Sequence, residues 1–298
     1  MFELFQGISQ FFISLFASTA MQADINHDGY HSQLPLQHSI PGGVVIVDAG
    51  YGFQPPSVRF NEQPVMVVRP DPQQSWKAVV GIPLTQPAGE AEVYIERKAR
   101  RINIAAHDYQ QQHLNVARKH VDLSPENLAR VRSEQQKIKQ AFARFSRDTG
   151  FTPERGFSPL AWPLAGDLSS PFGLQRFFNG QPRKPHSGLD IAAVTGSAIL
   201  APADGEVVLT GNFFFNGNSV FIDHGQGLIT MYCHMDSLEV SEGERVIAGD
   251  RLGTVGATGR VTGPHLHWTA SLNNARVNPL LLLSPLPGVA APTAHAHE

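Results

Sequence analysis

The chain has 298 residues, a formal net charge of −3 at pH 7 and 16% charged residues. This length is enough for two domains of ordinary size. The charged residues form neither a basic stripe nor an acidic tail. The sequence therefore lacks the charge patterns typical of nucleic-acid-binding proteins and of acidic solvating proteins. The single cysteine, Cys233, excludes an internal disulfide.

Residues 1–23 resemble a secretory signal peptide. The apolar run 8–16 is followed by small residues between positions 17 and 23, as in the h-region and cleavage zone of such signals. No Lys or Arg precedes the run, so a short amphipathic helix, a misassigned start and an uncleaved anchor stay open. No other apolar stretch approaches the ~20 residues of a membrane span. We expect a periplasmic or secreted protein with no stable membrane span after signal removal.

Residues 24–120 are predicted to form an immunoglobulin-like β-sandwich. Its expected strands are 44–47, 65–68, 76–82 and 91–96. Within the last strand, alternation places Val93 and Ile95 on one face. Clusters of Pro and Gly separate the strands, which is typical of a small β-sandwich. No polar residues here have the spacing of ligands, so we expect a spacer, a folding aid or a substrate-docking module rather than a second active site.

Residues 121–155 are predicted to be a helical linker. Ser124 as N-cap, Pro125 at the first helical position and Glu126 in the first turn indicate where the helix begins. We expect it to end near residues 148–150. Its apolar stripe consists of Leu128, Val131, Ile138, Phe142 and Phe145. The opposite face is basic and is expected to be solvated while the helix packs on a neighbour; a partner-binding helix is the alternative.

Residues 156–285 are again β-rich and dense in glycine, with expected strands at 206–209, 219–223 and 228–231. None of the glycines has the dinucleotide-binding or P-loop spacing. Two phenylalanine groups, 177–178 and 213–215, are candidates either for the walls of a groove or for the core. The Pro/Ala-rich residues 286–298 are predicted to be a disordered tail.

This region holds two short strings with metal-ligand chemistry. In the first, His186 and Asp190 are four residues apart, and Gly188 lets the chain bend so that they can converge. In the second, His265 and His267 are two residues apart, so on a strand both imidazoles face one side. The first string alone is a weak signal and the second a moderately specific one, with an exposed pair on a polar sheet face as its alternative. Together, imidazole and carboxylate can hold zinc and leave one coordination position open.

A third string, Tyr232-Cys233-His234, ends an apolar strand. Alternation sends Tyr232 and His234 to one side of the strand and Cys233 to the other. Cys233 is therefore predicted to be a buried core thiol rather than a ligand or nucleophile. His224, which lies at a turn, is predicted to be structural.

In this order, the three strings resemble those of the lysostaphin-type (LytM-like) zinc metallopeptidases, which are murein endopeptidases. The resemblance extends over residues 162–282 and includes the segment 201–205 and the glycine-punctuated run 240–263. The N-terminal β-region and helix resemble, more loosely, the modules that precede this peptidase domain in some Gram-negative envelope proteins.

The resemblance implies a compact antiparallel β-domain with a zinc groove and one Zn²⁺ per chain. It implies metal-binding roles for His186, Asp190 and His267 and catalytic roles for His234 and His265. Either catalytic histidine can be the general base, and the other can stabilise the oxyanion. A structural zinc or metal-buffer protein is disfavoured, because the histidines outnumber the three ligands.

The implied reaction is hydrolysis of peptide cross-links in peptidoglycan, at the bond between D-alanine and diaminopimelate. The implied partners are peptidoglycan peptide stems and a regulatory protein. The alternative function is a non-catalytic envelope scaffold that binds murein or activates another cell-wall hydrolase. The presence of all five polar side chains weighs against that alternative.

Overall fold

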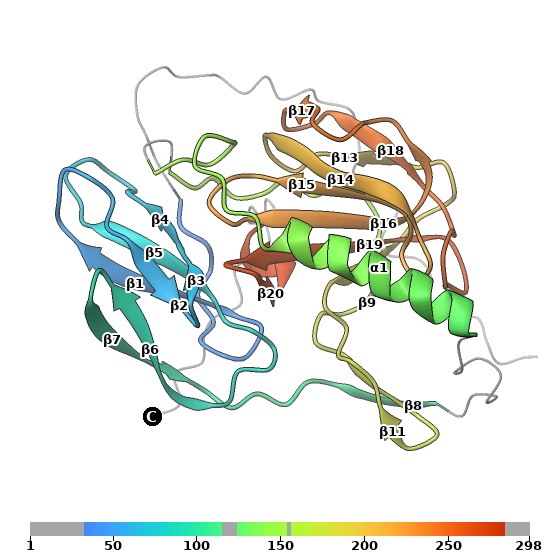
Figure 1. The fold of residues 1–298 in the computed structure, drawn as a ribbon, viewed down its shortest axis with the longest axis horizontal. Coiled ribbons are helices and arrows are strands. Elements are labelled where there is room, and N and C mark those ends of the chain that lie inside the picture. Colours follow the sequence, from blue (N-terminus) through green and yellow to red (C-terminus); the bar gives the residue numbers. More distant parts are fainter. Residues whose placement is uncertain (1–32, 115–123, 154–155, 284–298) are drawn as a thin grey trace, which may run out of the picture.

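The computed structural model describes residues 33–114, 124–153 and 156–283. The predicted signal peptide (1–23), the predicted tail (286–298) and the start of the predicted linker lie outside the described residues. The described chain consists of two β-rich regions and one long helix (Figure 1), which confirms the mainly β fold class. Within these residues, no helix combines the length and apolar character needed to cross a membrane.

The N-terminal region is a sandwich of two sheets. One sheet has the order β1-β5-β4 and the other the order β3-β2-β6-β7. The strands are β1 (Val44–Gly50), β2 (Val58–Phe60), β3 (Gln63–Pro64), β4 (Met66–Val68), β5 (Trp76–Gly81), β6 (Gly89–Ile95) and β7 (Lys98–Ile104). Both sheets contribute to one apolar core, in which Phe60, Val80 and Val93 are almost fully buried. This confirms the predicted sandwich; β2, β3 and the strongly basic β7 were not predicted.

The next strand leaves the sandwich and joins the C-terminal region. β8 (Gln111–Leu114) pairs in parallel with β10 (Gln175–Phe178), which pairs antiparallel with β11 (Gln181–Pro182). We call this three-stranded unit the β8–β10–β11 sheet; it extends below the main body in Figure 1. The predicted sandwich limit at residue 120 includes β8, although the strand pairing of β8 lies entirely with the later region.

Helix α1 (Pro125–Phe142) begins as predicted, because the side chain of Ser124 accepts a hydrogen bond from the backbone N–H of Asn127. Its predicted end near residues 148–150 is wrong. The following residues bond to a loop of the C-terminal region instead, with the carbonyl of Ser146 accepting from Gln226 N–H. The basic residues of the helix are exposed, as expected, and the guanidinium of Arg130 also donates to the backbone carbonyl of Asn212.

The C-terminal region is built on a large sheet of order β17-β14-β15-β16-β19-β12-β9. Its strands are β9 (Asp167–Ser170), β12 (Leu189–Ala192), β14 (Gly205–Phe213), β15 (Gly217–Asp223), β16 (Ile229–Leu238), β17 (Arg245–Val246) and β19 (His265–Leu272). Three further strands, β13 (Ala198–Leu200), β18 (Arg251–Val255) and β20 (Ala275–Val277), attach to this path, and the short helix η2 (Pro279–Leu281) follows.

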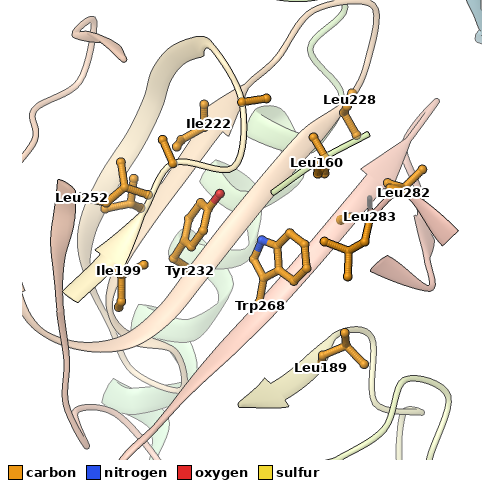
Figure 2. Close-up of a cluster of buried hydrophobic side chains, with 14 of the residues drawn as sticks. Leu160, Leu189, Ile199, Ile222, Leu228, Tyr232, Leu252, Trp268, Leu282 and Leu283 are labelled. Atoms are coloured by element: carbon orange, nitrogen blue, oxygen red, sulfur yellow. The ribbon is translucent and has the colours of Figure 1, made fainter. Parts of the chain in front are cut away.

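The two faces of this sheet bury different side chains. On one face, Tyr232 and Trp268 lie side by side in the main apolar cluster, shown in Figure 2. On the other face, Phe142 of α1 packs against Phe221 of β15, and Cys233 belongs to the same small cluster. Helix α1 therefore covers one part of the second face and leaves the rest of that face for other side chains.

The two regions pack tightly against each other. Met66 and Val79 of the sandwich belong to the same apolar cluster as Val277 of the C-terminal region. The side-chain amide of Asn273 forms two hydrogen bonds with the backbone of Gly81, one to its N–H and one to its carbonyl. One face of the sandwich therefore shares an apolar cluster with the C-terminal region, separate from the core between the two sandwich sheets.

Candidate metal and catalytic site

The pairing of β12 with β19 brings three of the predicted site residues onto one sheet face. Asp190 lies opposite His267, and Leu266 lies opposite Ile191. Directly opposed residues of an antiparallel pair share a face. Leu266 and Ile191 are buried in the main apolar core, so Asp190, His265 and His267 face the other way. The expected orientation of the two histidines is confirmed.

His186 reaches the same place from the segment that precedes β12. Its backbone is fixed to the base of β10, because its N–H donates to the carbonyl of Leu174 and its own carbonyl accepts from Gly173 N–H. Gly188 is required by close approach rather than by an unusual backbone angle. A Cβ at Gly188 would lie 2.5 Å from the carbonyl oxygen of Trp268. Glycine therefore lets the loop lie directly on β19.

Three potential ligand atoms converge at this point. His186 Nε2 lies 3.0 Å from both Asp190 Oδ1 and His267 Nδ1, and the last two atoms are 2.8 Å apart. Donor atoms around a tetrahedral zinc ion are about 3.3 Å apart, because each metal–ligand bond is about 2.0–2.1 Å long. Two imidazole nitrogens and one carboxylate oxygen form an ordinary zinc ligand set, so these residues fit the ion.

The outer hydrogen bonds of the two imidazoles explain why this convergence needs a cation. His186 Nδ1 donates to the carbonyl of Pro171 over 2.8 Å, and His267 Nε2 lies 3.0 Å from Thr269 Oγ1. With the hydrogens on these outer nitrogens, the inner nitrogens of the neutral rings carry lone pairs. Two lone pairs and a carboxylate then face one another, which is repulsive unless a metal ion or a proton lies between them. Such outer partners are typical of metal-binding histidines.

The protonation states suit metal binding. Burial raises the pKa of Asp190, but the close approach of the His186 and His267 rings outweighs burial and holds that pKa below its usual range. Burial lowers the pKa of His267, which favours its neutral ring. An ionised carboxylate and neutral imidazoles are the forms that coordinate metals.

His234 lies at a β-bulge in β16. The strand pairing runs through Tyr232 opposite Val220 and then through Met235 opposite Asn218. Between these pairs, two residues of β16 face one of β15, and His234 takes the left-handed φ of 65°. An extra residue of this kind changes the direction of the side chains that follow it.

Because of the bulge, His234 joins the other site histidines. The centroid of its ring lies 4.9 Å from that of His265 and 6.1 Å from that of His267. Tyr232 instead packs in the core with Trp268. The expectation that Tyr232 and His234 share one side is therefore wrong, because strict alternation does not hold across a bulge.

The two histidines outside the ligand triangle have the same tautomer. His234 Nδ1 donates to the carbonyl of Thr258 and His265 Nδ1 to that of Gly263, each over 2.9 Å. Carbonyl oxygens only accept, so in each neutral ring Nε2 carries the lone pair. His265 Nε2 lies 3.8 Å from Asp190 Oδ1. Burial, with smaller contributions from neighbouring histidines, lowers the pKa of His234 to about 4, so this ring is neutral at neutral pH.

Thr258 is a site residue that the sequence argument missed. Its carbonyl orients His234, and its hydroxyl donates to the carbonyl of Met235 while accepting from Asn218 N–H. The threonine thus fastens the bulge to the turn between β14 and β15. Nothing in its sequence neighbourhood distinguishes it from the other polar residues of a glycine-rich loop.

The residues predicted to be structural stay outside the site. Cys233 is buried, and burial raises the pKa of its thiol to about 12. His224 is fully buried, with one ring nitrogen bonded to the carbonyl of Asp204 and the other to Thr230 Oγ1. Of the two phenylalanine groups, Phe213 is buried in the cluster beside α1, whereas residues 177–178 are half-buried on β10.

Comparisons with known proteins agree with this geometry. The family model "Peptidase family M23" matches residues 184–279, and "Peptidase family M23 N-terminal domain" matches residues 37–107. A crystal structure from Pseudomonas aeruginosa, described as a candidate M23 peptidase, is 39% identical and superimposes with a TM-score of 0.68. That likeness covers 83% of this chain and 96% of the other.

Curated relatives match over shorter stretches. The DD-carboxypeptidase/endopeptidase Mpg of Neisseria meningitidis is 40% identical over 40% of this chain and 28% of its own length. The peptidoglycan DD-endopeptidase ShyA of Vibrio cholerae is 40% identical over 46% of this chain and 32% of its own. The chain thus spans about a third of the length of these relatives. The extended match to the Pseudomonas structure and both family models show that the chain belongs to peptidase family M23, which confirms the resemblance found in the sequence.

Proposed function

We propose that this chain is a zinc-dependent endopeptidase that hydrolyses peptide cross-links of peptidoglycan. The observation that carries the proposal is the triangle of His186 Nε2, Asp190 Oδ1 and His267 Nδ1, with all three separations between 2.8 and 3.0 Å. The names of the relatives, which include peptidoglycan DD-endopeptidases, support the substrate class. Within that class we propose the bond between D-alanine and diaminopimelate.

In this proposal His186, Asp190 and His267 hold one Zn²⁺. Zinc bound by three protein side chains supplies a Lewis acid that polarises a carbonyl and lowers the pKa of water. The protein's share of this chemistry is to keep the carboxylate ionised and both rings in the required tautomer. Pro171 and Thr269 contribute through the outer hydrogen bonds that orient the two rings.

His234 and His265 supply the proton transfers. In each neutral ring Nδ1 donates to a backbone carbonyl, which leaves the lone pair of Nε2 available to accept a proton. The centroids of the two rings lie 4.9 Å apart. One Nε2 takes the proton of the attacking water and delivers it to the leaving amine. The other, once protonated, donates a hydrogen bond to the oxyanion. Both rings adjoin the ligand triangle, with His265 Nε2 3.8 Å from Asp190 Oδ1 and the centroid of the His234 ring 6.1 Å from that of His267, so a substrate carbonyl held at the triangle can meet them.

The substrate also determines where the protein acts. Peptidoglycan lies outside the cytoplasmic membrane, so we propose a periplasmic or secreted location in the cell envelope. A regulatory protein partner stays a prediction from the resemblance.

The test is to digest purified sacculi with the purified protein and to identify the released muropeptides by mass spectrometry. We expect about one zinc per chain and cross-linked dimers converted into monomers, with the cut at the D-alanyl bond. A chelator should stop the release, and added zinc should restore it. A protein that binds zinc but releases no peptide would instead support the non-catalytic scaffold.

A further inference from the structure

The β8–β10–β11 sheet beside the site carries an uncompensated positive charge. Residues 111–114 and 175–186, which form this sheet and its connection to His186, include three cationic side chains and no Asp or Glu. The three cations are Arg176, Arg183 and Lys184. Across the described parts of the chain, none of the three forms an ion pair with a carboxylate. This contrasts with the whole sequence, whose net charge is −3.

Arg176 is held in place by neutral partners. Its Nη2 donates to Ser170 Oγ over 2.8 Å, and its Nε donates to Gln112 Oε1 over 3.3 Å. A guanidinium has five N–H donors, so most of its hydrogen-bonding capacity is left over. A side chain oriented by neutral groups keeps its full charge available for an anion.

The position of Ser170 places this charge close to the ligand triangle. Ser170 on β9 pairs with Asp190 on β12, which pairs with His267 on β19. Opposed residues share a face, so the three side chains form a row across the sheet, and Arg176 bonds to its outer end. One strand spacing of about 4.8 Å plus one hydrogen bond separates Asp190 from the guanidinium. An extended peptide advances about 3.5 Å per residue, so Arg176 lies about two residues from a bond held at the triangle.

The opposite strand makes the charge denser. The backbone N–H of Arg183 donates to the carbonyl of Arg176, so two guanidinium-bearing residues face each other across the hairpin. Like charges directly opposite each other on a sheet are destabilising. Arg183 lies over the ring of Phe178, 5.4 Å from its centroid. A bound anion would relieve the repulsion that the hairpin otherwise retains.

We propose that the β8–β10–β11 sheet is a carboxylate-binding subsite, in which Arg176 receives a free carboxylate of the peptide stem about two residues from the cleaved bond. Arginine suits this task because its planar fork binds carboxylates in a bidentate manner. Arg183 and Lys184 add to the attraction. This inference rests on the proposed function, since it names the part of the peptidoglycan substrate that the site recognises.

The test compares a soluble cross-linked muropeptide dimer with the same dimer after amidation of its free carboxylates. Wild-type protein should show a KM about 10- to 100-fold lower for the free-carboxylate dimer, the range of a charge-assisted hydrogen bond. Arg176→Gln should raise the KM for that dimer by a similar factor, with kcat little changed, and should leave the amidated dimer unaffected. Arg176→Lys, which keeps the charge but loses the fork, should fall between them.

Arg100→Gln is the matched control, because it removes the same charge from the exposed part of β7 in the sandwich. It should alter neither KM. If Arg176→Gln weakens both dimers equally, or if wild-type protein handles both dimers alike, the subsite does not exist and Arg176 only joins strands. Unfolding midpoints show whether the variants fold. If Arg176→Gln does not fold, the KM values of wild-type protein for the two dimers still show whether a free carboxylate is recognised.

Calorimetric binding of a single uncross-linked stem separates this inference from the proposed function. Suppose that the protein cleaves nothing but binds free stems about 10-fold or more tightly than amidated stems. This result would overturn the proposed enzyme activity and support the carboxylate-binding subsite. If the protein cleaves both dimers but binds free and amidated stems equally well, the subsite is overturned and the proposed enzyme activity is supported.

Discussion

The N-terminal sandwich and the C-terminal region are both built from short antiparallel strands, yet they differ in what they bury. Among the described residues of the sandwich, Ser75 is the one polar side chain classed as buried, whereas the C-terminal region buries Asp190, Asp223, His224 and His234. Burying an ionisable group is costly without partners. The contrast therefore points to the region in which polar side chains serve a purpose beyond folding.

A second contrast separates structural from functional groups within the C-terminal region. Both ring nitrogens of His224 are bonded to groups that satisfy them, namely a backbone carbonyl and a hydroxyl. At the site, by contrast, the lone pairs of His186 and His267 and the carboxylate of Asp190 face one another. The hydrogen bonds of His224 are those of a structural residue, whereas the arrangement of the other three side chains is that of a candidate metal site.

The largest effect is expected from Asp190→Ala. Removal of one of the three proposed ligands should abolish zinc binding and lower peptidoglycan hydrolysis by at least about 10³-fold, since zinc would provide the main activation of water. Zinc content by mass spectrometry and muropeptide release would show both losses. Asp48→Asn in the sandwich is the control. Asp48 is largely exposed and pairs with Lys77, so its loss should cost under about 1 kcal/mol of stability and no activity.

His265→Ala should separate catalysis from metal binding. Loss of a proton-transfer group typically lowers kcat about 10²- to 10⁴-fold, while the three proposed ligands stay in place, so zinc should stay near one per chain. Turnover on a cross-linked muropeptide, measured beside zinc content, gives the answer. Near-normal turnover would contradict the division of roles between His265 and His267.

Phe60→Ala tests whether the sandwich serves stability alone. The ring is 1% exposed in the sandwich core, and truncation of a buried phenylalanine typically costs about 3–5 kcal/mol. We expect a lower free energy of unfolding in urea but an unchanged zinc content and rate per folded molecule. A fall in rate per folded molecule would mean that the sandwich also shapes the site.

The smallest effect concerns the pH dependence of stability. Burial lowers the pKa of His224 below its ordinary value of 6.5. Below pH 6.5 the unfolded chain therefore binds more protons than the folded one, and stability falls as the pH is lowered, by at most about 1.4 kcal/mol per pH unit for one group. Metal-free His224→Gln protein should show a shallower decline than metal-free wild type in urea unfolding at pH 7.5 to 5.5. Equal slopes would mean that His224 does not titrate in this range.

Much of the fold and the site was predictable because the responsible signals are local. The start of α1 follows from Ser124 and Pro125, and the shared orientation of His265 and His267 follows from the period of a strand. The end of α1 was not predictable, because residues 143–151 leave the helix to bond to a loop about 80 residues later.

The orientation of His234 was not predictable for a similar reason. It depends on a bulge that is defined against β15 and fastened by Thr258, and neither partner is marked in the sequence around His234. The ligand and catalytic assignments themselves came from the family resemblance, and the geometry shows only that the five side chains meet.

The path of β8 has a consequence for dissecting this protein. A truncated catalytic fragment starting at residue 120 would lack the strand that covers one edge of β10, leaving unpaired backbone N–H and carbonyl groups next to Arg176. Open strand edges recruit other chains and promote aggregation. Removing the sandwich by a cut at residue 120 would therefore alter the neighbourhood of the site, whereas a cut before Gln111 would keep the strand that covers this edge of β10.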